Sequence, residues 1–231
     1  MKQDVENVGK NKGGDFMKIE LLHYTPIEPI IKATAMPYQS KENKGLVKRV
    51  FESGHRSIVR HGMASFLVKD VSQSLLRQIS RHPHINLTVK STRYCDMSDT
   101  NFYIPDRVKK EGKHIEYEAD LKKIMVIYKK WKDYEGNEKE VDVAKQFLPL
   151  ASTTDLVVSG NYQALYEFCQ LRNCVRAESE IRELSLAITK TLKKIIPEIF
   201  DNLGCKGDEY KICPENHGSC GKYPIKKELM K

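Results

Sequence analysis

The segment AESEIRELSLAITKTLKKIIPEIFDNLG, residues 177–204, constrains the fold more than any other part of the sequence. Its apolar residues recur at the three- and four-residue spacing of a helix that buries one face. They are Ile181, Leu184, Ala187, Ile188, Leu192, Ile195 and Ile196. The segment therefore predicts a long amphipathic helix packed on a core.

Other stretches alternate between strand and helix patterns. Strands are expected in FMKIELLHY (16–24), MASFLVKD (63–70) and HINLTVKSTRY (84–94). Helices are expected in residues 45–55, 114–136 and 161–174, with a shorter helix after residue 138 that breaks at Pro149. Without repeats or a linker before residue 200, we predict one α+β domain over 17–204. A disordered leader at 1–16 and a Cys-containing tail at 205–231 flank it.

The segment DVSQSLLRQISRH, residues 70–82, predicts a helix that leads into a strand. Asp70 or Ser72 is the expected cap, and Pro83 is expected to end the helix because proline disfavours helical backbone in the residue before it. Gln78 and His82 are four residues apart, which would place them on one helical face. Arg81 and His82 are expected at the junction between the helix and the strand.

Positive charge is concentrated in one stretch of the chain. The net charge is +8, and residues 41–93 alone hold eleven Lys/Arg against three acids. This concentration suggests an anionic ligand, although a solvated basic face remains an alternative. With no apolar run long enough for a membrane span and no secretory signal, we expect a cytoplasmic protein that binds no membrane and has reduced thiols.

The tail contains Cys205, Cys213, His217 and Cys220, a set that could bind a metal. Their spacing fits no zinc-finger pattern, so we predict an extended tail and no metal.

Arg77, Arg81 and Arg93 supply forked donors for phosphate. The chain has no recognisable nucleophile–base pair, no GxGxxG and no Walker loop. Composition and spacing thus indicate a protein that binds phosphorylated ligands.

The stretch RHPHINLTVKSTRY, residues 81–94, resembles the RHRxxSxNExSxRY signature of the flavin-dependent thymidylate synthases, the ThyX family. SGHRSIVRHGMASFLV resembles the family's GHxSxxEH region, and LRNCVRAESEIRELSLAI resembles LRxxxxAQWEIRxxAxAI. FYIP, LPL and the tail CPENHGSCG follow in the family's order, so the resemblance runs from about residue 17 to residue 221. It implies a curved, mainly antiparallel sheet packed with long helices.

The resemblance implies an enzyme that converts dUMP to dTMP without a covalent nucleophile. FAD reduced by NADPH would supply the hydride, and methylenetetrahydrofolate would supply the carbon. The family is homotetrameric, with active sites between subunits, and no nucleic-acid partner is expected. Arg172 and His55 would be catalytic. FAD would contact Ser57, Arg81, His82, Pro83, Asn161 and Glu167, and dUMP would contact Gln78, Ser91, Arg93, Lys145 and Arg172.

Several of these positions depart from the family pattern. Pro83 replaces an arginine, Val89 an acid or amide, and Lys145 an arginine. Glu167 replaces an asparagine, and Arg60 replaces the acid of the family's EH pair, so we expect Arg60 to bind an acid elsewhere. Two alternatives therefore stay open: a paralogue acting on another pyrimidine nucleotide, and a non-catalytic protein that binds nucleotides or nucleic acid.

Overall fold

The computed structural model describes residues 17–136, 140–215, 217–225 and 228, so the predicted leader at 1–16 lies outside the described residues. Its centre is a four-stranded sheet with the strand order β1-β2-β4-β3. The strands are β1 (Lys18–Tyr24), β2 (Met63–Ser72), β3 (Ile85–Val89) and β4 (Thr153–Asn161). Every neighbouring pair is antiparallel. This confirms the predicted α+β class and antiparallel sheet.

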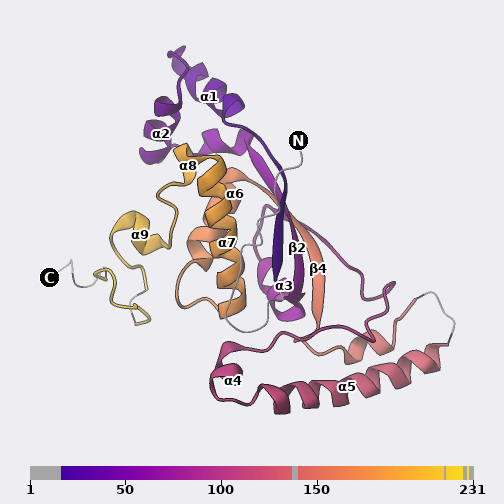
Figure 1. Cartoon of the computed structure of the whole chain (residues 1–231). Coiled ribbons are helices and arrows are strands. Elements are labelled where there is room, and N and C mark those ends of the chain that lie inside the picture. The colour runs from indigo at the N-terminus through magenta and orange to yellow at the C-terminus, as the bar shows by residue number, and fades with distance from the viewer. Residues whose placement is uncertain (1–16, 137–139, 216, 226–227, 229–231) are drawn as a thin grey trace.

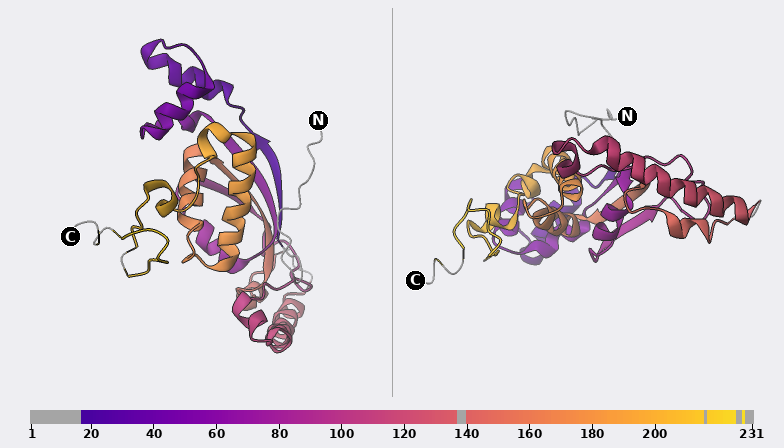
Figure 2. Two further views of the ribbon diagram at one scale, coloured as in Figure 1. Left: turned by 60° about the vertical axis from the view of Figure 1, so that its left-hand side comes forward. Right: turned by 90° about the horizontal axis from the view of Figure 1, so that it is seen from below.

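Helices surround the sheet on one face and at both ends (Figure 1). They are α1 (Glu28–Ala35), α2 (Lys44–Glu52), α3 (Gln73–Ile79), α4 (Asp106–Lys110), α5 (His114–Glu135), α6 (Tyr162–Arg172), α7 (Ser179–Ile195), α8 (Pro197–Phe200) and α9 (Lys206–Tyr210). Helices α6 and α7 lie side by side against the sheet, with α1 and α2 at one end and α4 and α5 at the other (Figure 2). Two 3₁₀ turns used below are η2 (Arg56–His61) and η3 (Ala144–Phe147).

The main core lies between the sheet and these two helices. Alternate residues of β2 and β4, such as Phe66 and Val158, are fully buried and face the helices. In α7 the predicted stripe packs against them, with Ile181, Leu184 and Ile188 fully buried. A second, smaller cluster joins α5 to η3 through Met97, Met125, Tyr128, Val141 and Ala144.

Three local predictions are wrong. Helix α3 ends at Ile79, so Gln78 and His82 do not share a helical face. The predicted strand 84–94 ends at Val89, and residues 92–94 form a turn whose Arg93 carbonyl accepts a hydrogen bond from Val141 N at 2.7 Å. The helix expected before Pro149 is only the four-residue turn η3. In the last two cases a tertiary contact replaces the continuation of a local pattern.

Candidate active site

Arg172 is the last residue of α6, and its side chain contacts α3 and the loop that follows α3. The side chain of Asn161 caps the start of α6 by accepting a hydrogen bond from Ala164 N at 2.9 Å. At the other end, Arg172 Nε donates to His82 Nε2 at 3.0 Å, and its terminal nitrogen donates to the Gln78 carbonyl at 3.3 Å. Three residues predicted to serve flavin and nucleotide are thereby brought together, although the predicted shared helical face is wrong.

His82 is neutral in this arrangement. Burial, followed by the nearby Arg172 cation, lowers the pKa of His82 to about 4. Its ring also packs edge-on against Phe168, with the ring centroids 4.9 Å apart. Because Nε2 accepts the hydrogen bond from Arg172, the imidazole proton lies on Nδ1. His82 therefore acts as an uncharged acceptor that fixes the Arg172 guanidinium.

Glu178 is a polar partner of this cluster that the sequence did not assign to it. Gln78 Nε2 donates a hydrogen bond to the carboxylate of Glu178, the residue immediately before α7. This bond fixes the Gln78 amide and leaves its Oε1 directed elsewhere to accept a hydrogen bond. The sequence signal for this partner is that Glu178 stands where the motif LRxxxxAQWEIRxxAxAI, which the segment resembles, has a glutamine.

Two adjoining cavities lie where β2 begins and β4 ends. One of about 230 Å³ is lined by Arg60, His84, Asn161, Gln163, Ala164 and Glu167. The other, of about 440 Å³, shares Arg60, His84 and Asn161 with the first and adds His61 and Asn86 among its lining residues. His84 lines both cavities and has a strained left-handed backbone with φ of 70°. The structure thus places two predicted flavin contacts, Asn161 and Glu167, in one hollow.

A chain of side chains holds the acid in this hollow. Arg60 Nε donates to Gln163 Oε1 at 2.6 Å, and Gln163 Nε2 donates to Glu167 Oε1 at 2.8 Å. The expectation that Arg60 binds an acid directly is therefore wrong, because an amide lies between the two charges. Arg81 and Pro83 are exposed in the loop before β3, and His55 and Ser57 are exposed at the start of η2.

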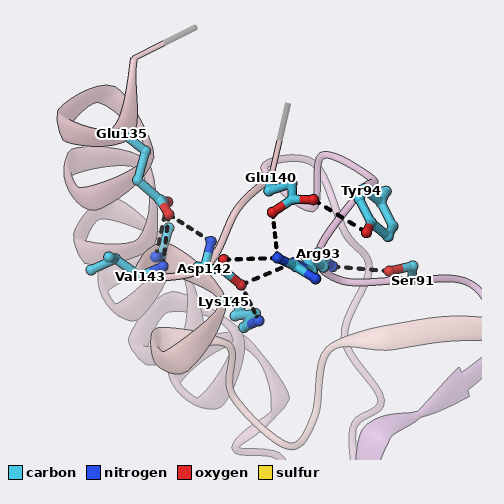
Figure 3. Close-up of polar contacts among 9 residues, drawn as sticks. Ser91, Arg93, Tyr94, Glu135, Glu140, Asp142, Val143 and Lys145 are labelled. Atoms are coloured by element: carbon cyan, nitrogen blue, oxygen red, sulfur yellow. Dashed lines mark hydrogen bonds and ion pairs between the residues drawn. The ribbon is translucent and has the colours of Figure 1, made fainter. Parts of the chain in front are cut away.

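The remaining predicted nucleotide contacts form a second group after β3 (Figure 3). Arg93 makes ion pairs with Glu140 and, at 3.2 Å, with Asp142, and Lys145 Nζ lies 2.5 Å from Asp142. Ser91 Oγ accepts a hydrogen bond from Arg93 N at 3.2 Å. The hydrogen bond from Lys145 contributes most to lowering the pKa of Asp142, so this carboxylate is ionised at neutral pH.

Glu135 orders the turn that carries these acids (Figure 3). Its carboxylate accepts hydrogen bonds from the backbone N–H groups of Asp142, Val143 and Ala144 at 2.6, 2.7 and 3.1 Å. Three successive amides converging on one carboxylate form an anion-binding nest. The turn from 140 to 145 is thus held in place to present acids to Arg93 and Lys145.

The two groups of predicted nucleotide contacts are separated by β3. Gln78 precedes this strand, whereas Ser91 and Arg93 follow it. A five-residue strand spans about 15 Å. Within the part of the chain that the structure describes, no hydrogen bond or ion pair joins the two groups. Within the described residues, the predicted nucleotide contacts thus form two separate groups of hydrogen bonds and ion pairs, one before β3 and one after it.

The described part of the chain contains no cluster of three or more His, Cys, Asp or Glu side chains arranged to hold a metal ion. Among the same residues, no helix is both long enough and apolar enough to cross a lipid bilayer. The six cysteines are all free thiols.

Comparisons with known proteins agree on one family. The family model described as thymidylate synthase complementing protein matches residues 20–198. A flavin-dependent thymidylate synthase of Nitratidesulfovibrio vulgaris is 27% identical over 197 residues, which cover 82% of this chain and 80% of that protein. The protein of the same name from Clostridium tetani is 27% identical, and the alignment covers 96% of this chain and 98% of that protein.

A solved structure is also similar. The crystal structure of Helicobacter pylori thymidylate synthase X with FAD and dUMP superposes with a TM-score of 0.66 at 25% identity. The alignment covers 81% of this chain and 99% of that one. The family match over residues 20–198 includes the segments that carry Arg172, His82 and the residues lining the two cavities.

Proposed function

This chain belongs to the family of thymidylate synthase complementing proteins, and on that premise we propose that it converts dUMP to dTMP as a flavin-dependent thymidylate synthase. The observation that carries the proposal is the fixed guanidinium of Arg172, which is held by His82 of the signature segment and by the backbone carbonyl of Gln78 in α3. The chain is accordingly an enzyme, a transferase that uses FAD.

The residues around the two adjoining cavities fit a flavin dinucleotide. Arg60, His61 and His84 offer side-chain N–H donors, and Asn86 and Asn161 offer amide donors, which suit a pyrophosphate. Glu167 is the one acid among the lining residues, and Gln163 already donates to it. Asn161 uses its side-chain oxygen for the cap of α6, so its amide N–H groups remain to donate. Exposed Arg81 supplies a further guanidinium near β3.

Arg172 would polarise the substrate. A fixed guanidinium beside the uracil stabilises negative charge that develops on the ring oxygens, and such prearranged charge lowers a barrier more than a mobile one. Burial lowers the pKa of Arg172, with the Arg81 cation second, yet an arginine begins so high that it stays charged at neutral pH. Bound FAD, reduced by NADPH, would supply the hydride, and methylenetetrahydrofolate the carbon.

We further propose that two subunits complete each nucleotide site in a homotetramer. Gln78 and Arg172 of one chain would bind the base, while Ser91, Arg93 and Lys145 of a second chain would bind the phosphate. The separation of these groups across β3 supports this division. The expected compartment is the cytoplasm, where six free thiols are stable.

Purified protein tests the proposal. We expect a yellow protein with bound FAD that releases tritium from 5-tritiated dUMP when methylenetetrahydrofolate and NADPH are supplied. Replacing Arg172→Ala should lower kcat/KM about 100- to 1,000-fold, whereas Arg172→Lys, which keeps the charge and loses the fork, should lose less. FAD bound and reducible without tritium release would contradict the function, and full activity of Arg172→Ala would remove the role of Arg172.

A paralogue that acts on another pyrimidine nucleotide is the second candidate. It is favoured by the acids Glu140 and Asp142, which neutralise Arg93 and Lys145, and by Val89, which cannot hydrogen-bond a base. Turnover of dUMP compared with UMP and dCMP under identical conditions separates the two candidates. A colourless protein that binds nucleotides without FAD would instead favour the non-catalytic alternative.

A further inference from the structure

The tail that follows the family match contacts the segment that carries His55 and Ser57. The match ends at residue 198, and α9 lies beyond it. From α9, the Glu209 carboxylate forms an ion pair with Arg56 of η2 and accepts hydrogen bonds from Gln170 Nε2 and, at 3.2 Å, from Tyr166 OH. The Arg56 and Glu209 side chains are only 21% and 20% exposed. The contact is thus largely enclosed and links the tail to both η2 and α6.

Aromatic rings hold Arg56 from its other sides. Its guanidinium lies 4.9 Å from the Tyr166 ring centroid and 5.6 Å from that of Phe51, and these two rings meet edge-on at 5.1 Å. Cations over aromatic faces gain more when water is excluded. Burial, the largest influence, raises the pKa of Tyr166, so its hydroxyl remains protonated and donates to Glu209. Arg56 therefore has one orientation as long as the carboxylate is present.

Arg56 lies between two residues that have no side-chain support of their own. His55 and Ser57 are exposed, and within the described ranges neither side chain makes a hydrogen bond or an ion pair. Their placement follows from the backbone of η2. Val59 is fully buried in the middle of this turn. At its start, the His55 N–H donates to the Val50 carbonyl at 3.2 Å, and the Arg56 side chain ties the turn to the tail.

We propose that Glu209 is a positioning residue for the reaction: from the tail, it holds Arg56 and so fixes η2, which presents the predicted catalytic residue His55 and the predicted flavin contact Ser57. This inference rests on the proposed function. Contacts within the tail hold α9 in place. Asp208 accepts hydrogen bonds from Cys205 N and from Tyr223 OH, both at 2.8 Å, and forms an ion pair with Lys222. The tail thus holds η2 in the position that the proposed active site requires.

Glu209→Ala and Glu209→Gln in the full-length holoenzyme test this role. The alanine variant leaves Arg56, Gln170 and the Tyr166 hydroxyl without their acceptor, so backbone hydrogen exchange in residues 55–61 should become at least about tenfold faster. We expect FAD to bind about tenfold more weakly and kcat/KM to fall about 10- to 100-fold, with the loss in kcat as well as in KM. Glu209→Gln retains an acceptor of the same shape and should lie between wild type and alanine.

Glu215→Gln is the matched control. It removes the Arg176–Glu215 ion pair, which ties the same tail to the loop after α6 and does not contact η2. We expect wild-type exchange in η2, FAD affinity and turnover. The role of Glu209 is overturned if Glu209→Ala lowers Tm alone, while exchange in η2, FAD affinity, kcat and KM stay at wild-type values.

Failure of the proposed function would look different. A wild-type protein that neither binds FAD nor turns over dUMP would refute the thymidylate synthase activity. In that protein, faster exchange of residues 55–61 in Glu209→Ala would still establish the contact between tail and η2, and unchanged exchange would overturn it.

Discussion

At the scale of single residues, the charge state of His82 decides what Arg172 can do. Because its pKa is lowered to about 4, His82 is neutral from that pH upward, and it gains a proton only as the pH falls through 4. Protonation would remove the acceptor for Arg172 Nε and add repulsion. We expect the His82 ring signals in an NMR titration to have a midpoint near 4. A midpoint near 6.5, with a matching step in kcat/KM, would contradict this.

Glu140 and Asp142 should weaken substrate binding, because they form ion pairs with Arg93 and Lys145, the two cations proposed to bind the dUMP phosphate. Arg93 and the two acids are 42%, 41% and 50% exposed, so solvent screening leaves each ion pair weak. Asp142→Asn and Glu140→Gln should therefore lower KM for dUMP about 1.5- to 5-fold with kcat unchanged. Asp99→Asn, which breaks the exposed pair with Lys129, is the control and should change neither constant. A higher KM in the first two variants would show that the acids orient the cations for the nucleotide.

At the scale of elements, one buried acid joins α7 to α3. Glu180 is 2% exposed and accepts hydrogen bonds from Ser72 N, at 2.7 Å, and from Ser72 Oγ, the hydroxyl that caps α3. Burial is the largest influence and raises the pKa of Glu180 to about 7. The folded state therefore holds a proton that the unfolded state loses above about pH 4.5.

Stability should accordingly fall as the pH rises between these two values. The stability contributed by protonated Glu180 is complete below about pH 4.5 and lost as the pH rises through 7, a change of at most about 3 kcal/mol. The side chain of the Glu180→Gln variant cannot ionise. The difference in unfolding free energy between this variant and wild type should therefore change in favour of the variant as the pH rises from about 4.5 to 7, and stay constant above pH 7. Denaturant unfolding at several pH values measures this. Glu118→Gln, in an exposed pair on α5, should track wild type throughout, and equal slopes for all three proteins would refute the assignment.

The elements that could be predicted from the sequence are those whose local pattern and tertiary environment agree. The stripe of α7, the cap at Ser72, the helix expected over residues 114–136 and the strand β2 all follow from spacing and propensity. The helix expected near Val141 and Ala144 did not form, because both residues belong to the apolar cluster that includes Tyr128 and because the Glu135 carboxylate accepts hydrogen bonds from the backbone amides of the turn. No local pattern reveals a carboxylate seven to nine residues earlier as the partner of those amides.

At the scale of the whole molecule, the candidate site could be predicted only as far as a family motif extends. The motif supplied Arg81, His82, Ser91 and Arg93 as one set, but a contiguous motif does not show that a strand divides it. The tail was expected to be extended, yet Glu209 and Asp208 fold it back against η2 and onto itself. Both features depend on contacts between residues far apart in sequence, which spacing rules do not encode.

The division by β3 makes a prediction about the assembled protein. If one site takes Arg172 from one subunit and Arg93 from another, Arg172→Ala and Arg93→Ala should each be inactive alone and partly active after subunit exchange. Random mixing in equal amounts leaves about one quarter of the sites with both arginines, so activity should approach about one quarter of wild type. Mixing two preparations of Arg172→Ala controls for recovery on refolding. If the mixed variants stay inactive although native mass spectrometry shows mixed tetramers, both arginines act within one chain, and β3 would have to move to bring them together.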